Sequence, residues 1–138
     1  MIMDQELVLM DNAAVTGASA VNGSEKDIGP IDPGAGEELW LNALVRTTLS
    51  GNSVSTLAVV LQDDTATGMA SAADHDTLTL PAITAGSRAA MRITPGCNRF
   101  IRARAEMDAA PTAGKIDVFI TKDAPYHNHK AKNYAVGQ

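Results

Sequence analysis

Acidic side chains gather in two short groups that could hold a hard cation. Asp63-Asp64 form one group and Asp74-His75-Asp76 the other. Both flank residues 65–73, a small and polar stretch that predicts a long loop. At one end of such a loop, carboxylate oxygens could coordinate calcium. Acids that only make a loop soluble produce the same pattern, and we favour that plainer interpretation.

Three other patterns fall short of a chemical site. His127-Asn128-His129 supplies two ligands, and a transition-metal site needs more. Gly34-Ala35-Gly36 lacks a third glycine and precedes a predicted strand rather than a helix, so it is a poor phosphate loop. Cys97 is far in sequence from any histidine, which favours a buried or idle thiol over a nucleophile. The sequence therefore predicts no enzyme, no cofactor and no metal site.

Arginines are the most distinctive polar feature of the second half of the chain. The set comprises Arg88, Arg92, Arg99, Arg102 and Arg104. On the outer faces of neighbouring strands they would form a basic stripe that binds carboxylates of another chain. Pairing within the chain is the alternative, since residues 1–80 carry twelve acids and two bases, and residues 81–138 four acids and nine bases. Glu37, Glu38, Asp63 and Asp64 would then be the partners. Nucleic acid is a distant third, because no aromatic residue is interleaved for base stacking.

Trp40 and Leu44 fall on the face of their predicted strand opposite Leu39, Leu41 and Val45. Either the chain's own N-terminal segment covers them, or they are buried against a second subunit or another partner. Both alternatives remain open at this point. The full set of candidate interface residues is Trp40, Leu44, Arg88, Arg92, Arg102, Arg104, Tyr126 and Tyr134.

The elements that must position these residues are short strands. Apolar residues alternate with polar ones in most of residues 38–49, 54–62, 88–93, 100–107 and 116–122. Further strands are expected at Leu7–Met10, near Val15–Ala20 and at Thr77–Leu80, giving about eight, separated by Gly and Pro turns. A helix over 103–110 is rejected because arginines occupy one face of the alternation and Pro111 would end it. The fold class predicted is an all-β antiparallel sandwich or barrel.

Length and composition favour one domain without disulfides. The chain has 138 residues and a single Cys, with only 4% aromatic residues, so we expect a thin aliphatic core. The domain is expected over 1–124, with an extended C-terminal tail over 125–138. The acidic N-terminus does not resemble a signal peptide, and no apolar run is long enough for a membrane span. We expect a soluble protein, made in the cytosol and used there or built there into something larger.

The order of motifs resembles that of the capsid cement proteins of short-tailed bacteriophages, from about residue 5 to residue 123. The motifs are Leu7–Asn12 with Ala14–Thr16, Asp27–Gly29, Gly34–Leu41, Thr56–Asp63, Ala85–Arg88, Pro95-Gly96 with Arg99–Arg102, and Ala113–Ile116. Each motif is weak alone, and the ordered set at matching intervals carries the resemblance. Residues 63–76 and the basic tail depart from the pattern.

This resemblance implies a jelly-roll sandwich and a structural role in the virion. Such a protein would bind the outer surface of an icosahedral head, assembled in the host cytoplasm, and bridge neighbouring subunits of the major capsid protein against the pressure of DNA. We expect self-association as a homodimer or homotrimer on symmetry axes, with no direct contact to nucleic acid or membrane. The alternative is a carbohydrate- or receptor-binding β-sandwich module of a virion.

Overall fold

The computed structural model describes residues 8–28 and 39–121, and within them the chain forms nine strands and no helix. The strands are β1 (Val8–Ala14), β2 (Ala20–Asn22), β3 (Lys26–Asp27), β4 (Trp40–Ser50), β5 (Leu57–Asp64), β6 (Ala73–Thr79), β7 (Arg88–Arg92), β8 (Phe100–Met107) and β9 (Ala113–Thr121). The predicted all-β class is confirmed. No helix among these residues is long and apolar enough to cross a membrane.

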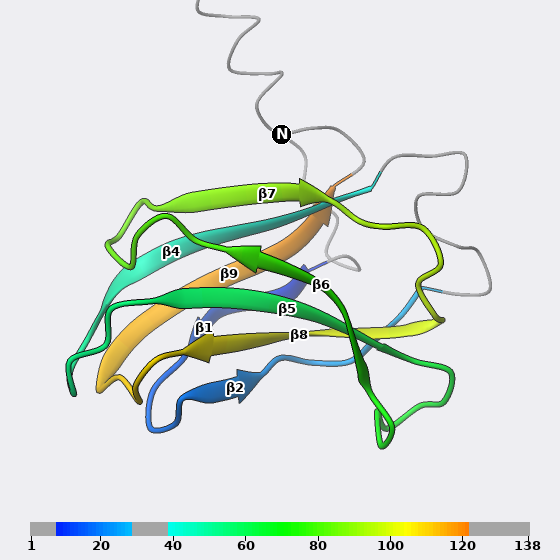
Figure 1. Ribbon diagram of the computed structural model, residues 1–138, viewed down its shortest axis with the longest axis horizontal. Helices are drawn as coiled ribbons and strands as arrows, with labels where there is room; N and C mark the ends of the chain where they lie inside the picture. Colours follow the sequence, from blue (N-terminus) through cyan, green and yellow to red (C-terminus); the bar gives the residue numbers. More distant parts are fainter. Residues whose placement is uncertain (1–7, 29–38, 122–138) are drawn as a thin grey trace, which may run out of the picture.

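The strands form two antiparallel sheets, shown in Figure 1 as two stacked layers. Sheet A has the order β1-β9-β4-β7, and sheet B has the order β2-β8-β5-β6 with β3 also paired to β8. The pairs are nested along the chain: β1 with β9, β2 and β3 with β8, β4 with β7, and β5 with β6. A long hairpin rolled into two layers gives this order, which is the jelly roll expected from the resemblance.

The core lies between the sheets and is aliphatic, as the composition predicts. In β8, Ile101, Ala103, Ala105 and Met107 are buried while the residues between them are partly exposed. The inward residues of β4 and β9 face them, and Leu41, Val45, Ile116 and Ile120 are each at most 2% exposed. Alternation with period two therefore selects the buried face, and the rejected helix over 103–110 is absent from this part of the chain.

Most predicted strands appear with shifted ends, and one is misplaced. The strand expected near Val15–Ala20 begins only at Ala20, because Gly17 has φ +83° and its N–H donates to the Pro111 carbonyl in a bend. β6 begins at Ala73 rather than Thr77. The short β3 was not predicted. It extends along β8 after an interruption at Gly23, whose N–H donates to the Ala103 carbonyl.

The loop between β5 and β6 has no strand or helix, as expected, but side-chain hydrogen bonds hold it in place. Asp64 accepts hydrogen bonds from the backbone N–H groups of Ala66 and Ser71 at 3.2 and 2.8 Å. These bonds, that of Ser71 first, lower the pKa of Asp64 from its ordinary value. Glu25, between β2 and β3, accepts hydrogen bonds from the Thr67 hydroxyl and the Gly68 N–H. The expected tail, residues 125–138, lies outside the described residues.

Candidate functional site

Four of the candidate interface residues lie together on the outer face of sheet A. The register of β4 and β7 places Trp40 opposite Arg92 and Leu44 opposite Arg88. Their outward direction follows from the alternation in β4, where Leu41, Ala43 and Val45 enter the core. We call Trp40, Leu44, Arg88 and Arg92 the Trp40 patch.

The Trp40 patch combines half-buried apolar side chains with exposed cations. Trp40 and Leu44 are half-buried, and Arg88 and Arg92 are exposed. The indole Nε1 of Trp40 is buried and has no hydrogen-bond acceptor in the described structure. Arg88 has no hydrogen-bond or ion-pair partner within residues 8–28 and 39–121. Tryptophan and arginine are the side chains that most often dominate protein interfaces, so the patch has the composition of a binding surface.

The prediction of a single arginine stripe is wrong. Arg102 and Arg104 lie on β8 in sheet B, whereas Arg88 and Arg92 lie on β7 in sheet A. The chain crosses from one sheet to the other between β7 and β8, so strands that follow each other in sequence are not neighbours. The arginines therefore occupy opposite outer faces of the sandwich.

On the outer face of sheet B, the arginines belong to a polar network within the chain. Arg102 Nε donates to Gln62 Oε1 at 2.8 Å, and Gln62 Nε2 donates to Asp74 Oδ1 at 3.0 Å. Arg104 pairs with Asp74 at 3.5 Å and with Glu106 of its own strand. Both arginines therefore have partners within the chain, and these partners differ from the acids named from the sequence.

Ion pairs also connect the acidic first half of the chain to its basic second half. Asp27 accepts two hydrogen bonds of 2.8 Å from the Arg99 guanidinium. The Cζ atom of Arg99 lies 5.3 Å from the Phe100 ring centroid. The hydrogen bonds to Asp27 raise the pKa of Arg99 above its ordinary value. Asp63 and Asp64 bind backbone N–H groups instead of arginines, and Glu37 and Glu38 lie outside the described residues.

The two acidic groups do not assemble the calcium site considered from the sequence. Asp63 accepts the Asn98 N–H at 2.7 Å, Asp64 holds its own loop, and Asp76 accepts the Thr94 N–H and hydroxyl at 2.9 and 2.7 Å. Asp74 faces the outside of sheet B with Gln62. Asp63 and Asp76 both bind the connection between β7 and β8, whereas Asp64 binds its own loop. These three carboxylates are buried, so the plainer interpretation, in which the acids only make a loop soluble, is wrong for them.

Asp63 instead meets two residues that lie far from it in sequence. One ligand atom from each of Asp63, His75 and Cys97 lies within 4.8 Å of the other two. Cys97 is buried, one of the two alternatives expected for its thiol, but its nearness to His75 could not be inferred from their positions in the sequence. The two residues come together because β6 and the β7–β8 connection meet at one end of the sandwich (Figure 1).

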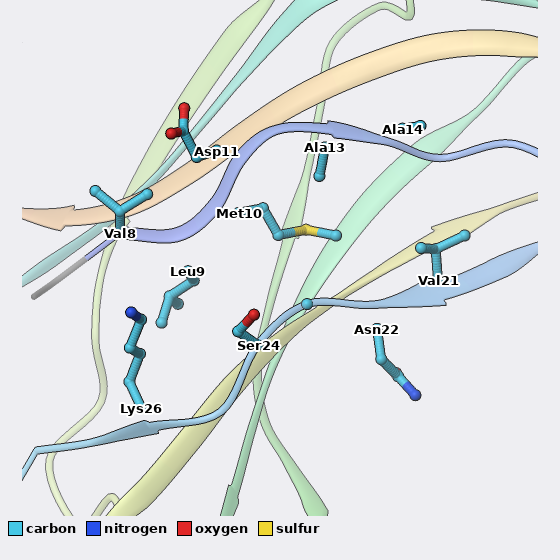
Figure 2. Close-up of a pocket in the computed structure, with 11 residues that line it drawn as sticks. Val8, Leu9, Met10, Asp11, Ala13, Ala14, Val21, Asn22, Ser24 and Lys26 are labelled. Carbon is cyan, nitrogen blue, oxygen red and sulfur yellow. The ribbon is translucent and has the colours of Figure 1, made fainter. Parts of the chain in front are cut away.

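A groove runs between the free edges of the two sheets (Figure 2). Its volume is about 490 Å³, and its walls are β1 on one side and the segment from β2 to β3 on the other. Met10 and Val21 line it from opposite sides, with Asp11, Asn22 and Lys26 adding polar groups. The groove is thus lined by apolar side chains together with a few polar ones.

The model of the Bbp16 family matches residues 9–120, which is most of the chain. The chain belongs to the Bbp16 family. No curated protein is similar enough to this chain to count as a match. Bbp16 is a phage-associated family, so the phage association expected from the resemblance is confirmed.

The Bbp16 match covers the sandwich and leaves out the tail. It begins at the second residue of β1 and ends at the residue before the last of β9. The Trp40 patch, the sheet B network and the cluster around Asp63 all lie within it. Tyr126 and Tyr134, the two remaining interface candidates, lie beyond both the match and the described residues.

Proposed function

We propose that this Bbp16-family protein is a capsid cement protein of a bacteriophage, with a structural rather than a catalytic role. It binds the outer surface of the icosahedral head, after assembly in the host cytoplasm, and bridges neighbouring major capsid protein subunits. The observation that carries this proposal is the match of a phage-associated family over all but the two end residues of the jelly roll. Among virion roles, the surface chemistry of sheet A favours attachment to protein.

The Trp40 patch supplies the shell-binding surface in this proposal. Its residues come from β4, which is paired on both sides, and from its neighbour β7, so the backbone beneath Trp40 and Leu44 is held by two ladders. A rigid backbone loses little conformational entropy on binding. Among the described residues Arg88 has no hydrogen-bond or ion-pair partner, and its planar guanidinium suits a carboxylate of the shell. The partner surface is therefore one that offers an apolar pocket for Trp40 beside acidic side chains.

Bridging requires that one copy contacts more than one shell subunit. Simultaneous contacts raise the apparent affinity without any new contact chemistry, so binding to assembled shells should exceed binding to free subunits by at least about 100-fold. Self-association around a two-fold or three-fold axis would add to this effect, since identical patches face each other there.

The test is the addition of purified protein to heads that lack it and, separately, to free capsid subunits. Co-sedimentation should show saturable binding to heads and weak binding to subunits, and decorated heads should release DNA at a higher temperature. Trp40→Ala should reduce head binding at least about tenfold, because a central aromatic anchor is lost. Arg102→Ala, on the opposite face, is the matched control.

Two results would contradict the proposal. One is equal affinity for heads and for dissociated subunits, and the other is heads that are equally heat-resistant with and without the protein. Binding to immobilised glycans without binding to heads would favour the carbohydrate- or receptor-binding alternative.

A further inference from the structure

Three segments bring a carboxylate, an imidazole and a thiol to one end of the sandwich. Asp63 is the residue before the last of β5, His75 lies near the start of β6, and Cys97 lies in the connection between β7 and β8. Their ligand atoms lie within 4.8 Å of one another. Asp63 and Cys97 are buried, and the His75 side chain is 14% exposed.

A β-bulge directs His75 into this cluster. On β6, Asp76 pairs with Leu61 and Asp74 pairs with the next residue of β5, Gln62, so His75 is the extra residue between them. Without the bulge, His75 would point away from both of its neighbours. With it, Asp74 stays outside while His75 and Asp76 both turn inward. Bulges commonly re-aim a side chain beside functional sites.

The hydrogen bond of the His75 ring leaves one nitrogen available as a ligand. Nε2 lies 2.6 Å from the Thr94 carbonyl oxygen, and a carbonyl only accepts, so Nε2 carries the hydrogen. Asp76 Oδ2, at 3.7 Å, lies near the same nitrogen. In the neutral ring, Nδ1 therefore presents its lone pair, and Asp63 Oδ2 lies 3.7 Å from it. Two electron-rich atoms facing each other at this distance are suited to a cation between them.

The groups around the ring are those that support a metal-binding histidine. Such histidines usually donate their other N–H to a carbonyl or carboxylate, which fixes the ring and its tautomer. Here the Thr94 carbonyl does so, and Asp76 binds the N–H and hydroxyl of the same Thr94. On the other side, Asn98 N–H holds Asp63 at 2.7 Å and so fixes the carboxylate.

We propose that Asp63, His75 Nδ1 and Cys97 bind one Zn²⁺ ion, with water as the fourth ligand. Zinc fits because its protein sites combine sulfur, imidazole and carboxylate ligands, whereas calcium takes oxygen ligands alone. With zinc bond lengths, the edges of a tetrahedral site are about 3.4 to 3.6 Å, close to the Nδ1–Oδ2 distance. The Cys97 sulfur lies within 4.8 Å of both other ligand atoms, so an approach of the β7–β8 connection by at most about 1 Å brings it to bonding distance. The thiol releases its proton to solvent when the metal binds.

The bound ion cross-links three segments at this end of the fold. It connects the end of β5 and the start of β6 to the connection that crosses from sheet A to sheet B. Because zinc would bind the folded chain and the cluster does not exist in the unfolded one, metal raises thermal stability. This inference concerns the fold and does not depend on attachment to a phage head.

The test uses the full chain, freed of metal by chelation and titrated with Zn²⁺ and Co²⁺. We expect one equivalent of zinc to raise the melting temperature by at least about 4 °C. Cobalt should give tetrahedral visible absorption and a thiolate-to-cobalt band in the near ultraviolet. The chain contains a single Cys, so such a band can come only from Cys97. The wild-type spectrum thus tests the thiolate ligand without any substitution.

Variants then separate this site from the histidines of the tail. Cys97→Ser should abolish the near-ultraviolet band, and His75→Gln should weaken zinc binding at least about tenfold. Asp74→Asn is the matched control, since Asp74 neighbours His75 but faces the outside of sheet B with Gln62. The double variant His127→Gln/His129→Gln removes the other histidines of the chain and should bind zinc as the wild type does.

Three outcomes would overturn the proposal: a cobalt spectrum without a thiolate band, zinc binding lost only in the tail variant, or a melting temperature that zinc leaves unchanged. The last would indicate that His75 serves only as a hydrogen-bonding and ion-pairing residue.

Discussion

The Asp117 carboxylate accepts a hydrogen bond of 2.7 Å from Arg46 Nη1, and only Asp117 is buried: the side chains are 9% and 51% exposed. The other oxygen of Asp117 accepts the Asn12 N–H at 2.6 Å. Asn12 has φ +48°, a left-handed conformation at an irregularity of the edge strand β1. Asp117 therefore holds the irregular part of β1 against β9, while Arg46 covers Asp117 from outside.

This asymmetry predicts unequal costs for removing the two partners. Asp117→Ala leaves the Asn12 N–H without its acceptor and should lower the free energy of unfolding by about 1 to 3 kcal/mol. Arg46→Ala removes an exposed cation and should cost about 0 to 1 kcal/mol. Urea unfolding of both variants, followed by tryptophan fluorescence, measures the difference. Equal losses would show that the ion pair, rather than the bond to β1, is what Asp117 contributes.

Asp108, which follows the end of β8, forms side-chain hydrogen bonds to the residues before β5. It accepts hydrogen bonds from the Ser55 hydroxyl at 2.6 Å, the Ser55 N–H at 2.8 Å and the Thr56 N–H at 3.1 Å. The Ser55 hydroxyl bond first, and then the two backbone bonds, lower the pKa of Asp108 from 3.8 to about 2. The carboxylate form is the one that the folded state prefers.

The lowered pKa of Asp108 predicts a loss of stability in acid. Its contribution is present above the unfolded value of 3.8 and disappears as the pH falls through about 2. Asp108→Asn should therefore be less stable than the wild type at pH 5, and the gap should narrow as the pH falls towards 2. Urea midpoints of both proteins across this range give the measurement. A gap that stays constant with pH would assign the effect to packing.

Gly51 is a position where both space and conformation require glycine. Its φ is +102°, and a Cβ there would lie 2.8 Å from the Thr112 nitrogen, which donates to the Ser50 carbonyl. Gly51→Ala should cost about 2 to 4 kcal/mol, from backbone strain together with the clash.

Gly86 separates the effect of backbone strain from that of the steric clash. Its φ is +93°, but a Cβ there would have no atom within 4 Å. Gly86→Ala should cost only about 1 to 2 kcal/mol, from strain alone. Thermal unfolding of the pair gives the comparison. If the two variants lose equal stability, contact with Thr112 does not matter.

Alternation was enough to predict the strands and their buried faces where polar and apolar residues differ clearly. Residues 100–107 show this, since arginines separate Ile101, Ala103 and Ala105, and all three are buried. The segment around Val15–Ala20 consists of small residues with little contrast, and there a glycine bend rather than alternation decides where β2 begins.

Contacts that depend on topology or on a bulge were not predictable in the same way. The arginine stripe was wrong because β7 and β8 belong to different sheets, which no local pattern encodes. The cluster of Asp63, His75 and Cys97 was missed because strict alternation places His75 on the wrong side of β6. A bulge moves it across, and a one-residue shift reverses the direction of a strand side chain. By contrast, the spacing of Trp40 and Leu44 along one strand was enough to predict that they share its outward face.

The division of the arginines between two faces yields the last prediction, which locates the surface that faces the shell. Arg88 in the Trp40 patch has no partner within residues 8–28 and 39–121, whereas Arg104 pairs with Asp74 and Glu106. Arg88→Ala should therefore leave the melting temperature unchanged. If the patch binds the shell, the same substitution removes a desolvated pair worth about 2 to 5 kcal/mol and lowers head occupancy at least about tenfold.

Arg104→Ala is the matched variant on sheet B. Its ion pairs are partly exposed, so the loss of stability should be about 0 to 1 kcal/mol. Head occupancy should remain that of the wild type, because sheet B would face away from the shell. Melting curves and quantitative co-sedimentation with heads measure both quantities for the two variants. The reverse pattern, with occupancy lost in Arg104→Ala and kept in Arg88→Ala, would place the shell on sheet B and make Arg102 and Arg104 the interface residues.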